Sequence, residues 1–277
     1  MTHTRAVFFL VMAATFWSIG GLFIKIIPWS PLAIAGARSF IAAIFLFCFL
    51  PQKNFKFSKA EVFTAISYFL TVSLFVTATK LTTAANAIFL QYTAPIYVVI
   101  LAHFFLKETP TKKDLTSLSI IFFGMILFFY EKMSLEGFWG NICAILSGMT
   151  FAMMTVQLRA QKAAEPMRSI VLGNIIAAVV LAPFIFQAPT LEMPALLNLF
   201  ILGIFQLGTA YLFYSKAVPH VTALEAIMVS MLEPILNPIW VLLMIGEKPS
   251  LVSILGGGII LAGVLSRSLM GRSAVAK

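Results

Sequence analysis

The chain has 277 residues, of which 61% are hydrophobic and only 10% carry a charge, and its mean hydropathy is +1.00. So few charged side chains cannot cover a water-soluble domain of this length, and the composition therefore indicates an integral membrane protein in contact with a lipid bilayer. The net charge of +9 does not indicate a nucleic-acid partner, because that class needs a basic patch on a soluble domain and the sequence offers none.

Apolar runs approach or exceed the ~20 residues that a helix needs to cross a membrane, and they lack the alternation of a transmembrane strand. Breaks at proline, glycine and charge clusters divide the chain into ten predicted transmembrane helices with short loops. The first run continues to Ile27, so we expect an uncleaved helix there and not a signal peptide. The predicted spans are 6–27, 32–50, 60–79, 83–106, 111–130, 138–158, 167–186, 194–217, 221–245 and 250–269.

The distribution of basic residues predicts how the chain is oriented. An even number of spans places both termini on one side of the membrane. Of the 19 lysines and arginines, Arg38 falls inside a span and four fall on the side away from the termini (Lys25, Lys80, Lys132 and Lys248), which leaves 14 on the side of the termini. Because cytoplasmic loops carry the excess of basic residues, we predict a multi-pass protein of the cytoplasmic membrane with both termini in the cytoplasm.

One phrase of the sequence occurs twice. FLQYTAPIYVVILAHFFLKETP covers residues 89–110, and MVSMLEPILNPIWVLLMIGEKP covers residues 228–249. An ungapped offset of 139 residues pairs Pro95 with Pro234, and it also pairs the glutamates that precede the final proline of each phrase. This indicates a tandem duplication, with one repeat in residues 1–133 and a second in residues 134–277. Each repeat holds five spans, an odd number, so the second repeat is expected to be inverted relative to the first.

Several short motifs occur in a characteristic order along the whole chain: FWSIGGLFIK, SPLAIAGARSFIAA, the two proline-to-glutamate phrases, TAYLFYSKA and GGGIILAG. In this order the chain resembles the ten-helix branch of the drug/metabolite transporter superfamily, whose members are built from two EamA-type repeats. The resemblance implies an all-α bundle of two inverted five-helix repeats around a central cavity. It also implies transport of small metabolites, often outward, without ATP.

We therefore predict a secondary transporter that exports a small organic metabolite by alternating access, with proton coupling as a further hypothesis. A passive channel or facilitator is the first alternative. An intramembrane enzyme is the second, although the sequence has no HExxH, no GxSxG and no serine–histidine pair within the membrane. No cofactor or metal site is predicted. The sequence leaves open the solute, the coupling ion, and whether the protein is a monomer or a homodimer.

Glu233 gives the sharpest functional signal. An acidic group at the centre of a membrane helix costs ~2.5 to 3.5 kcal/mol, so it is expected to face a cavity or a partner. Asn237 and Trp240 lie four and seven residues further on, on the same helical face. We predict that all three bind substrate and that Glu233 couples transport to protons. The alternative is a structural hydrogen bond from Glu233 to a neighbouring helix.

Three prolines, Pro95, Pro234 and Pro238, remove backbone donors inside predicted spans. Each is expected to kink its helix and take part in gating. Pro234 and Pro238 are also expected to free the carbonyls of Ser230 and Pro234 toward the cavity.

Other polar and aromatic residues in the spans are predicted to supply stacking surfaces and orienting hydrogen bonds to a substrate. These are Trp17, Gln91, Tyr92, Gln206, Tyr211, Tyr214 and Glu225. Glu225 has the alternative of reaching the cytoplasmic interface, and Tyr214 that of an interfacial belt. Arg38 is expected to anchor its helix by snorkelling or by pairing with a carbonyl. With two acids against one arginine in the membrane, the cavity is expected to be mildly electronegative, which suits organic cations.

Overall fold

The computed structural model describes residues 1–50, 56–131, 136–161, 165–188, 192–245 and 250–270, and within these segments all regular structure is helical. The elements of the first half are α1 (His3–Trp17), α2 (Gly20–Ile26), α3 (Pro31–Phe47), α4 (Lys59–Leu81), α5 (Ala84–Gln91), α6 (Ala94–Leu106) and α7 (Lys112–Phe129). Those of the second half are α8 (Phe138–Ala160), α9 (Pro166–Val180), α10 (Ala182–Phe186), α11 (Met193–Ile201), η1 (Leu202–Thr209), α12 (Ala210–Ala217), η2 (Val218–His220), α13 (Ala223–Ser230), α14 (Glu233–Ile245) and α15 (Leu251–Met270).

These elements follow the ten predicted spans to within a few residues at each end. Several spans are built from two or three consecutive elements, as α1 and α2 form the first. By length and composition alone, five runs among the described residues can cross a membrane: His3–Ile26, Lys59–Leu81, Ala84–Leu106, Phe138–Ala160 and Met193–His220. Three further apolar helices are shorter: Pro31–Phe47, Pro166–Val180 and Leu251–Arg267. The boundary predicted between residues 133 and 134 lies outside the described residues.

Hydroxyl residues fix where several helices begin. Thr83 caps α5 and its repeat mate Thr222 caps α13, each by accepting a hydrogen bond from the backbone N–H three residues further on. Thr111 forms a reciprocal capping box with Asp114 at the start of α7. Each cap satisfies a backbone donor that would otherwise have no partner in the membrane. The caps at Thr83 and Thr222 start a helix at equivalent positions in the two repeats.

Both copies of the phrase are also interrupted at equivalent positions. The helix of the fourth span breaks at Tyr92 and Thr93, between α5 and α6, and that of the ninth breaks at residues 231–232, between α13 and α14. Pro95 and Pro234 are each the second residue after the break, where a missing backbone N–H costs no helical bond. The predicted interruptions at these two prolines are therefore present, whereas a gating role remains a prediction.

The two halves are inverted relative to each other, and one pair of repeat mates makes this visible. Glu225 begins α13 and contacts His3 at the start of the first span. Its mate Asn86 lies in the first turn of α5 and donates to the Thr82 hydroxyl. The backbone carbonyl of Thr82 accepts a hydrogen bond from Lys25, at the far end of that span. Equivalent residues thus lie at opposite ends of the same membrane-spanning segment, as a dyad in the membrane plane requires.

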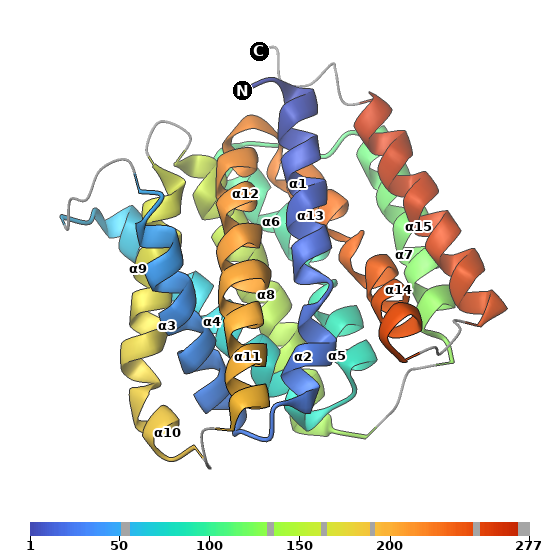
Figure 1. The fold of residues 1–277 in the computed structure, drawn as a ribbon. Helices are drawn as coiled ribbons and strands as arrows, with labels where there is room; N and C mark the ends of the chain where they lie inside the picture. The colour runs from blue at the N-terminus through green and yellow to red at the C-terminus, as the bar shows by residue number, and fades with distance from the viewer. Residues whose placement is uncertain (51–55, 132–135, 162–164, 189–191, 246–249, 271–277) are drawn as a thin grey trace.

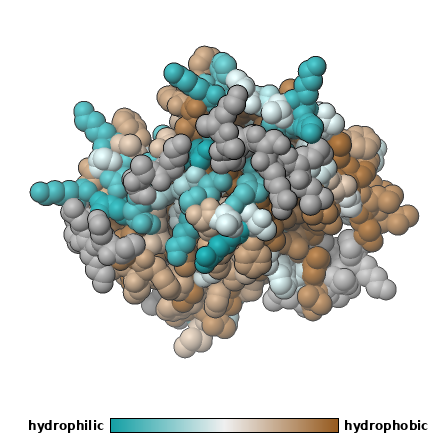
Figure 2. All heavy atoms as spheres, turned by 90° about the horizontal axis from the view of Figure 1, so that it is seen from above, coloured by the Kyte–Doolittle hydropathy of each residue, from teal (hydrophilic) through white to brown (hydrophobic). Residues whose placement is uncertain are grey.

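The helices pack side by side as a bundle, with α7 and α15 paired along one edge (Figure 1). Large hydrophobic side chains such as Phe104, Phe105 and Phe186 are exposed on the outside, where lipid would cover them. We call the face on which α1 begins and α15 ends the terminal face, and the other the opposite face. Seen from the terminal face, hydrophilic residues gather over the middle while hydrophobic residues form much of the rim (Figure 2).

Candidate functional site

A cavity lies in the middle of the bundle, between the two halves. Its volume is about 30 Å³, which holds about two water molecules. The lining residues are Trp17, Arg38, Thr71, Val72, Phe75, Gln91, Phe151, Gln206, Leu207, Tyr211 and Glu233. Five of the residues predicted from the sequence line this cavity together: Trp17, Gln91, Gln206, Tyr211 and Glu233. Their roles in binding remain predictions.

Aromatic rings form one wall of the cavity. Trp17 sits at the end of α1, with its ring centroid 5.0 Å from that of Tyr211 and 4.9 Å from that of Tyr214. Tyr211 also meets the ring of Tyr68 at 4.7 Å. Edge-to-face pairs of this kind stabilise a packed cluster and leave ring faces available for stacking. Tyr214 is fully buried in this cluster and bonds Thr155, so the alternative of an interfacial belt is wrong for this residue.

The carboxyl group of Glu233 is held by a residue of the other half. The Tyr92 hydroxyl lies 2.7 Å from Oε2 of Glu233 and 2.7 Å from the backbone carbonyl of Ser230. A phenol has a single hydrogen, and a carbonyl only accepts. Both contacts are fully satisfied when Tyr92 donates to Ser230 and accepts a hydrogen bond from a protonated Glu233. Tyr92 therefore adjoins the cavity through Glu233, and this arrangement of donors and acceptors suits a carboxyl group that carries a proton.

Arg38 is the lining residue whose setting was predicted least well. It is only 1% exposed, so it does not snorkel to an interface as one expectation held. Its Nη1 donates to Oε1 of Gln206 at 2.9 Å, and its Nη2 donates to the Val72 carbonyl at 3.0 Å. The predicted pairing with a carbonyl is present, but at the centre of the bundle.

The remaining predicted site residues lie elsewhere. The indole N–H of Trp240 donates to Ser18 Oγ at 2.7 Å, at the break between α1 and α2, and not into the cavity. The side chains of Asn237 and Pro238 lie outside what the structure describes. Glu225 is buried at the terminal face and does not line the cavity, so the cavity has one acid and one arginine. The expectation of a mildly electronegative cavity assumed two acids against one arginine, and it is therefore wrong.

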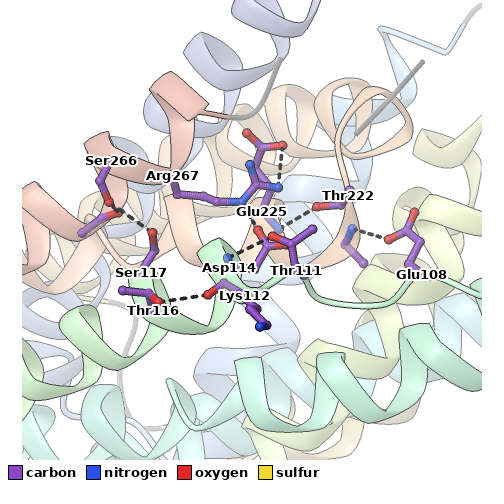
Figure 3. A network of polar contacts seen from close by, with 12 residues as sticks. Glu108, Thr111, Lys112, Asp114, Thr116, Ser117, Thr222, Glu225, Ser266 and Arg267 are labelled. Carbon is purple, nitrogen blue, oxygen red and sulfur yellow. Dashed lines mark hydrogen bonds and ion pairs between the residues drawn. The ribbon is translucent and has the colours of Figure 1, made fainter. Parts of the chain in front are cut away.

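Glu225 belongs to a terminal ion-pair network, which we define as His3, Asp114, Glu225 and Arg267. Figure 3 shows Asp114, Glu225 and Arg267 of this network. His3 Nε2 lies 2.9 Å from Glu225 Oε1, and Arg267 Nη2 lies 3.9 Å from Glu225 Oε2. Arg267 also pairs with Asp114 at the start of α7. The network joins α1 and α7 of the first half to α13 and α15 of the second, so it fastens the two halves together at this face.

A second contact between the halves lies beside this network. Glu108 accepts from Arg159 Nε at 2.9 Å and from the backbone N–H of Ala223 at 3.1 Å. Glu108 therefore complements the start of α13, a helix of the other half, and the charge of Arg159 offsets its own. The mate of Glu108, Glu247, lies outside the described residues.

The equivalent contacts at the opposite face carry no charge. The mates of Asp114 and Arg267 are Ser253 and Phe128, and Ser253 Oγ donates to the Phe128 carbonyl at 3.1 Å. The mate of Glu225 is Asn86, and Asn86 Nδ2 lies 3.2 Å from Oδ1 of Asn141 in the first turn of α8. At these equivalent positions, the contacts of Asp114, Glu225 and Arg267 are thus ionic at the terminal face, whereas those of their mates are neutral at the opposite face.

Sequence reasoning did not single out several residues that shape the site. Thr71, Val72 and Phe75 of α4 and Phe151 of α8 line the cavity. Thr71 could not be recognised as a lining residue from the sequence, because serine and threonine occur at many positions in membrane helices.

The family model of the EamA-like transporter family matches this chain twice, over residues 4–130 and 138–268. An uncharacterized transporter of Archaeoglobus fulgidus is 24% identical over 257 residues, which cover 92% of this chain and 93% of that protein. The uncharacterized transporter YoaV of Bacillus subtilis is 24% identical over 250 residues, covering 84% and 86%. A crystal structure with 15% sequence identity has the same fold, with a TM-score of 0.81 over 98% of this chain and all of the other. The chain belongs to the EamA-like transporter family and is a multi-pass membrane transporter.

Proposed function

We propose that the protein is a secondary transporter that carries a small organic metabolite across the cytoplasmic membrane by alternating access. We further propose that Glu233 binds the coupling proton and that net transport is outward, the direction implied by the resemblance of the sequence. The observation that carries the proposal is the pair of equivalent contacts at the two faces. Because mates in inverted repeats close opposite ends, exchanging the conformations of the two halves would open one end as it closes the other.

The small size of the cavity supports a cycle with large movements. Sites for small organic molecules occupy ~300–1,000 Å³. A cavity of about 30 Å³ has to widen before it admits such a molecule. Gln91, Arg38 and Glu233 are buried, so the polar groups of the cavity have little contact with solvent in this conformation. The helix breaks at Tyr92–Thr93 and at residues 231–232 provide places beside the cavity where such a movement can bend the chain.

Glu233 supports the proton-coupling part of the proposal. It is the acid among the cavity-lining residues, and it starts α14 directly after the break. Its hydrogen bond with Tyr92 links the two halves of the chain, and Glu233 itself lines the cavity. Binding or releasing a proton here would change the hydrogen bond that spans the halves, which connects the ionisation of one group to the movement of both.

Purified protein in sealed vesicles would test the proposal. Vesicles loaded with a candidate solute and placed in solute-free buffer should show saturable flux, and an imposed pH gradient should drive accumulation. An unlabelled solute on one side should also accelerate exchange of a labelled solute from the other, because a carrier returns loaded. Flux that does not saturate and shows no counterflow would favour a passive channel, and the absence of flux for every solute tested would contradict the proposal.

A further inference from the structure

The charge of Arg38 has no acidic partner among the residues that the structure describes. None of the ion pairs formed by the described residues includes Arg38, although its guanidinium is fully buried. A charged group at the centre of a membrane helix costs ~2.5 to 3.5 kcal/mol even on the scale that gives the lowest cost, and such groups normally pair with one another or mark a substrate pathway. Arg38 and Glu233 both line the cavity without forming an ion pair, so the guanidinium of Arg38 lies unpaired at the proposed transport site.

The hydrogen bonds of Arg38 are also incomplete. A guanidinium has five N–H donors in a planar fork. The two bonds to Gln206 and Val72 use Nη1 and Nη2, whereas Nε is buried without a partner. An unpaired buried donor is expensive, particularly on a charged group. The guanidinium edge that carries Nε can bind a carboxylate through two parallel N–H···O hydrogen bonds, as arginine commonly does.

The surrounding helices hold Arg38 in one orientation. Gln206 belongs to η1, a π-helix, and helices of this kind occur frequently at functional sites. Gly20 packs so closely against Gln206 that an added Cβ would lie 2.8 Å from its Nε2. A Cβ at Gly203 would likewise lie 2.6 Å from the side chain of Ile41 and 3.0 Å from the Arg38 carbonyl. The amide that positions the guanidinium is thus fixed by close packing and by the register of the π-helix.

We propose that Arg38 binds a carboxylate group of the transported solute. This inference rests on the proposed function and narrows the substrate class to small organic carboxylates. A single guanidinium matches a single negative charge, and the aromatic wall of Trp17, Phe151 and Tyr211 suits an apolar or aromatic body attached to it. The solute would supply both the missing counter-charge and an acceptor for Nε.

Matched pairs of ligands test this directly. The thermal stability of the purified protein in detergent would be measured with a library of small aromatic and aliphatic carboxylates, each paired with its uncharged carboxamide, for example phenylacetate with phenylacetamide. A ligand that binds only the folded protein raises its melting temperature in proportion to affinity and concentration. We expect carboxylates among the stabilising compounds, with a loss of at least tenfold in affinity for the corresponding amides. Equal stabilisation by the amides, or no stabilisation by any carboxylate, would overturn the inference.

Two variants separate binding from folding. Gln206→Glu places a carboxylate next to Arg38 Nη1. The new side chain should form an ion pair with the guanidinium inside the protein and keep the hydrogen bond. We expect this variant to fold and to lose stabilisation by carboxylates. Arg38→Lys should retain the charge, lose the planar fork and bind carboxylates more weakly. Unchanged carboxylate binding in a folded Gln206→Glu variant would contradict a role for Arg38.

The same measurements distinguish failure of the inference from failure of the carrier proposal. Binding of carboxylates without saturable flux in vesicles would leave the assignment of Arg38 intact and remove the transport mechanism. Saturable transport of an amine or a neutral solute, with no effect of any carboxylate, would retain the carrier and remove the assignment of Arg38.

Discussion

The hydroxyl group of Tyr92 and the carboxyl group of Glu233 meet at 2.7 Å beside the central cavity, and they come from different halves of the chain. Glu233→Gln preserves the size of the side chain and its capacity to bond Tyr92, but it cannot gain or lose a proton. We therefore expect Glu233→Gln to abolish accumulation driven by a pH gradient and to retain part of the solute exchange at equal pH on both sides. Transport into vesicles with and without a pH gradient measures both quantities.

The control for this variant is Glu192→Gln, because Glu192 is an exposed carboxylate at the start of α11, far from the cavity lining. It should transport as the unaltered protein does. If Glu233→Gln keeps the full response to the pH gradient, Glu233 has no part in coupling and its contact with Tyr92 is structural.

A separate prediction concerns Tyr92 itself. Tyr92→Phe removes the hydroxyl that bonds both Glu233 and the Ser230 carbonyl, and it leaves the ring in place. Without the hydroxyl, the buried carboxyl group of Glu233 loses its hydrogen bond to Tyr92, and the balance between its protonated and ionised forms changes. The pH at which transport is half-maximal should therefore shift by about one unit or more. The pH profile of exchange checks this. A profile identical to that of the unaltered protein would show that the hydroxyl does not influence the ionisation of Glu233.

The spans and the duplication were predictable from the sequence because both depend on local features. Hydropathy, proline positions and the two repeated phrases mark helices, breaks and inversion without knowledge of any contact between segments. The helix breaks next to Pro95 and Pro234 belong to this group, since a proline restricts the backbone wherever it occurs.

The site was only partly predictable, because the face that a helix turns to the cavity is decided by packing. Glu233 was identified since a buried acid is costly anywhere in a membrane. The position of Glu225 depends on His3 and Arg267, which lie far away in the sequence, and no local pattern indicates that they meet. Gln206 lies in a π-helix, whose wider turns shift the register of the face, so helical spacing did not reveal its contact with Arg38.

The terminal ion-pair network predicts an electrostatic gate. Removing one partner of a buried ion pair costs ~3–5 kcal/mol when the remaining charge is left without compensation. Asp114→Asn leaves Arg267 with Glu225, at 3.9 Å, so we expect a smaller cost for this variant. In Asp114→Asn, opening the terminal face would bring the guanidinium of Arg267 into water, so the open form should become more populated. A cysteine at Thr71, which lines the cavity, reports this with an impermeant thiol reagent once Cys48 and Cys143 are replaced by serine. We expect labelling from the terminal side to accelerate at least tenfold.

The matched control for the gate lies at the opposite face. Ser253→Ala removes the neutral contact at the position equivalent to Asp114, so it should affect labelling from the opposite side and by a smaller factor. Labelling of Thr71→Cys that is unaffected by Asp114→Asn would show that the network stabilises the fold without controlling access.

The contact between α7 and α15 depends on small residues. A Cβ at Gly256 would lie 2.4 Å from the backbone nitrogen of Phe128, whereas a Cβ at Gly258 would meet nothing within 4 Å. Gly256→Ala should therefore destabilise the protein by about 1–3 kcal/mol, because the two helices have to move apart. Gly258→Ala, on the same helix, should be neutral or stabilising by up to about 1 kcal/mol. Denaturation in detergent compares them, and equal effects would contradict the close packing.

The inverted topology can be tested with two lysines that flank α8 in the chain, Lys132 and Lys162, both of which lie outside the described residues. One precedes Phe138 and the other follows Ala160, so a membrane-spanning α8 places them on opposite sides. The excess of basic residues on the side of the termini predicts that a cysteine at 162 reacts from the cytoplasm and one at 132 from outside. Reversed reactivity would overturn the orientation alone. Reaction of both from the same side would remove the inversion, and with it the equivalence of the two gates on which alternating access depends.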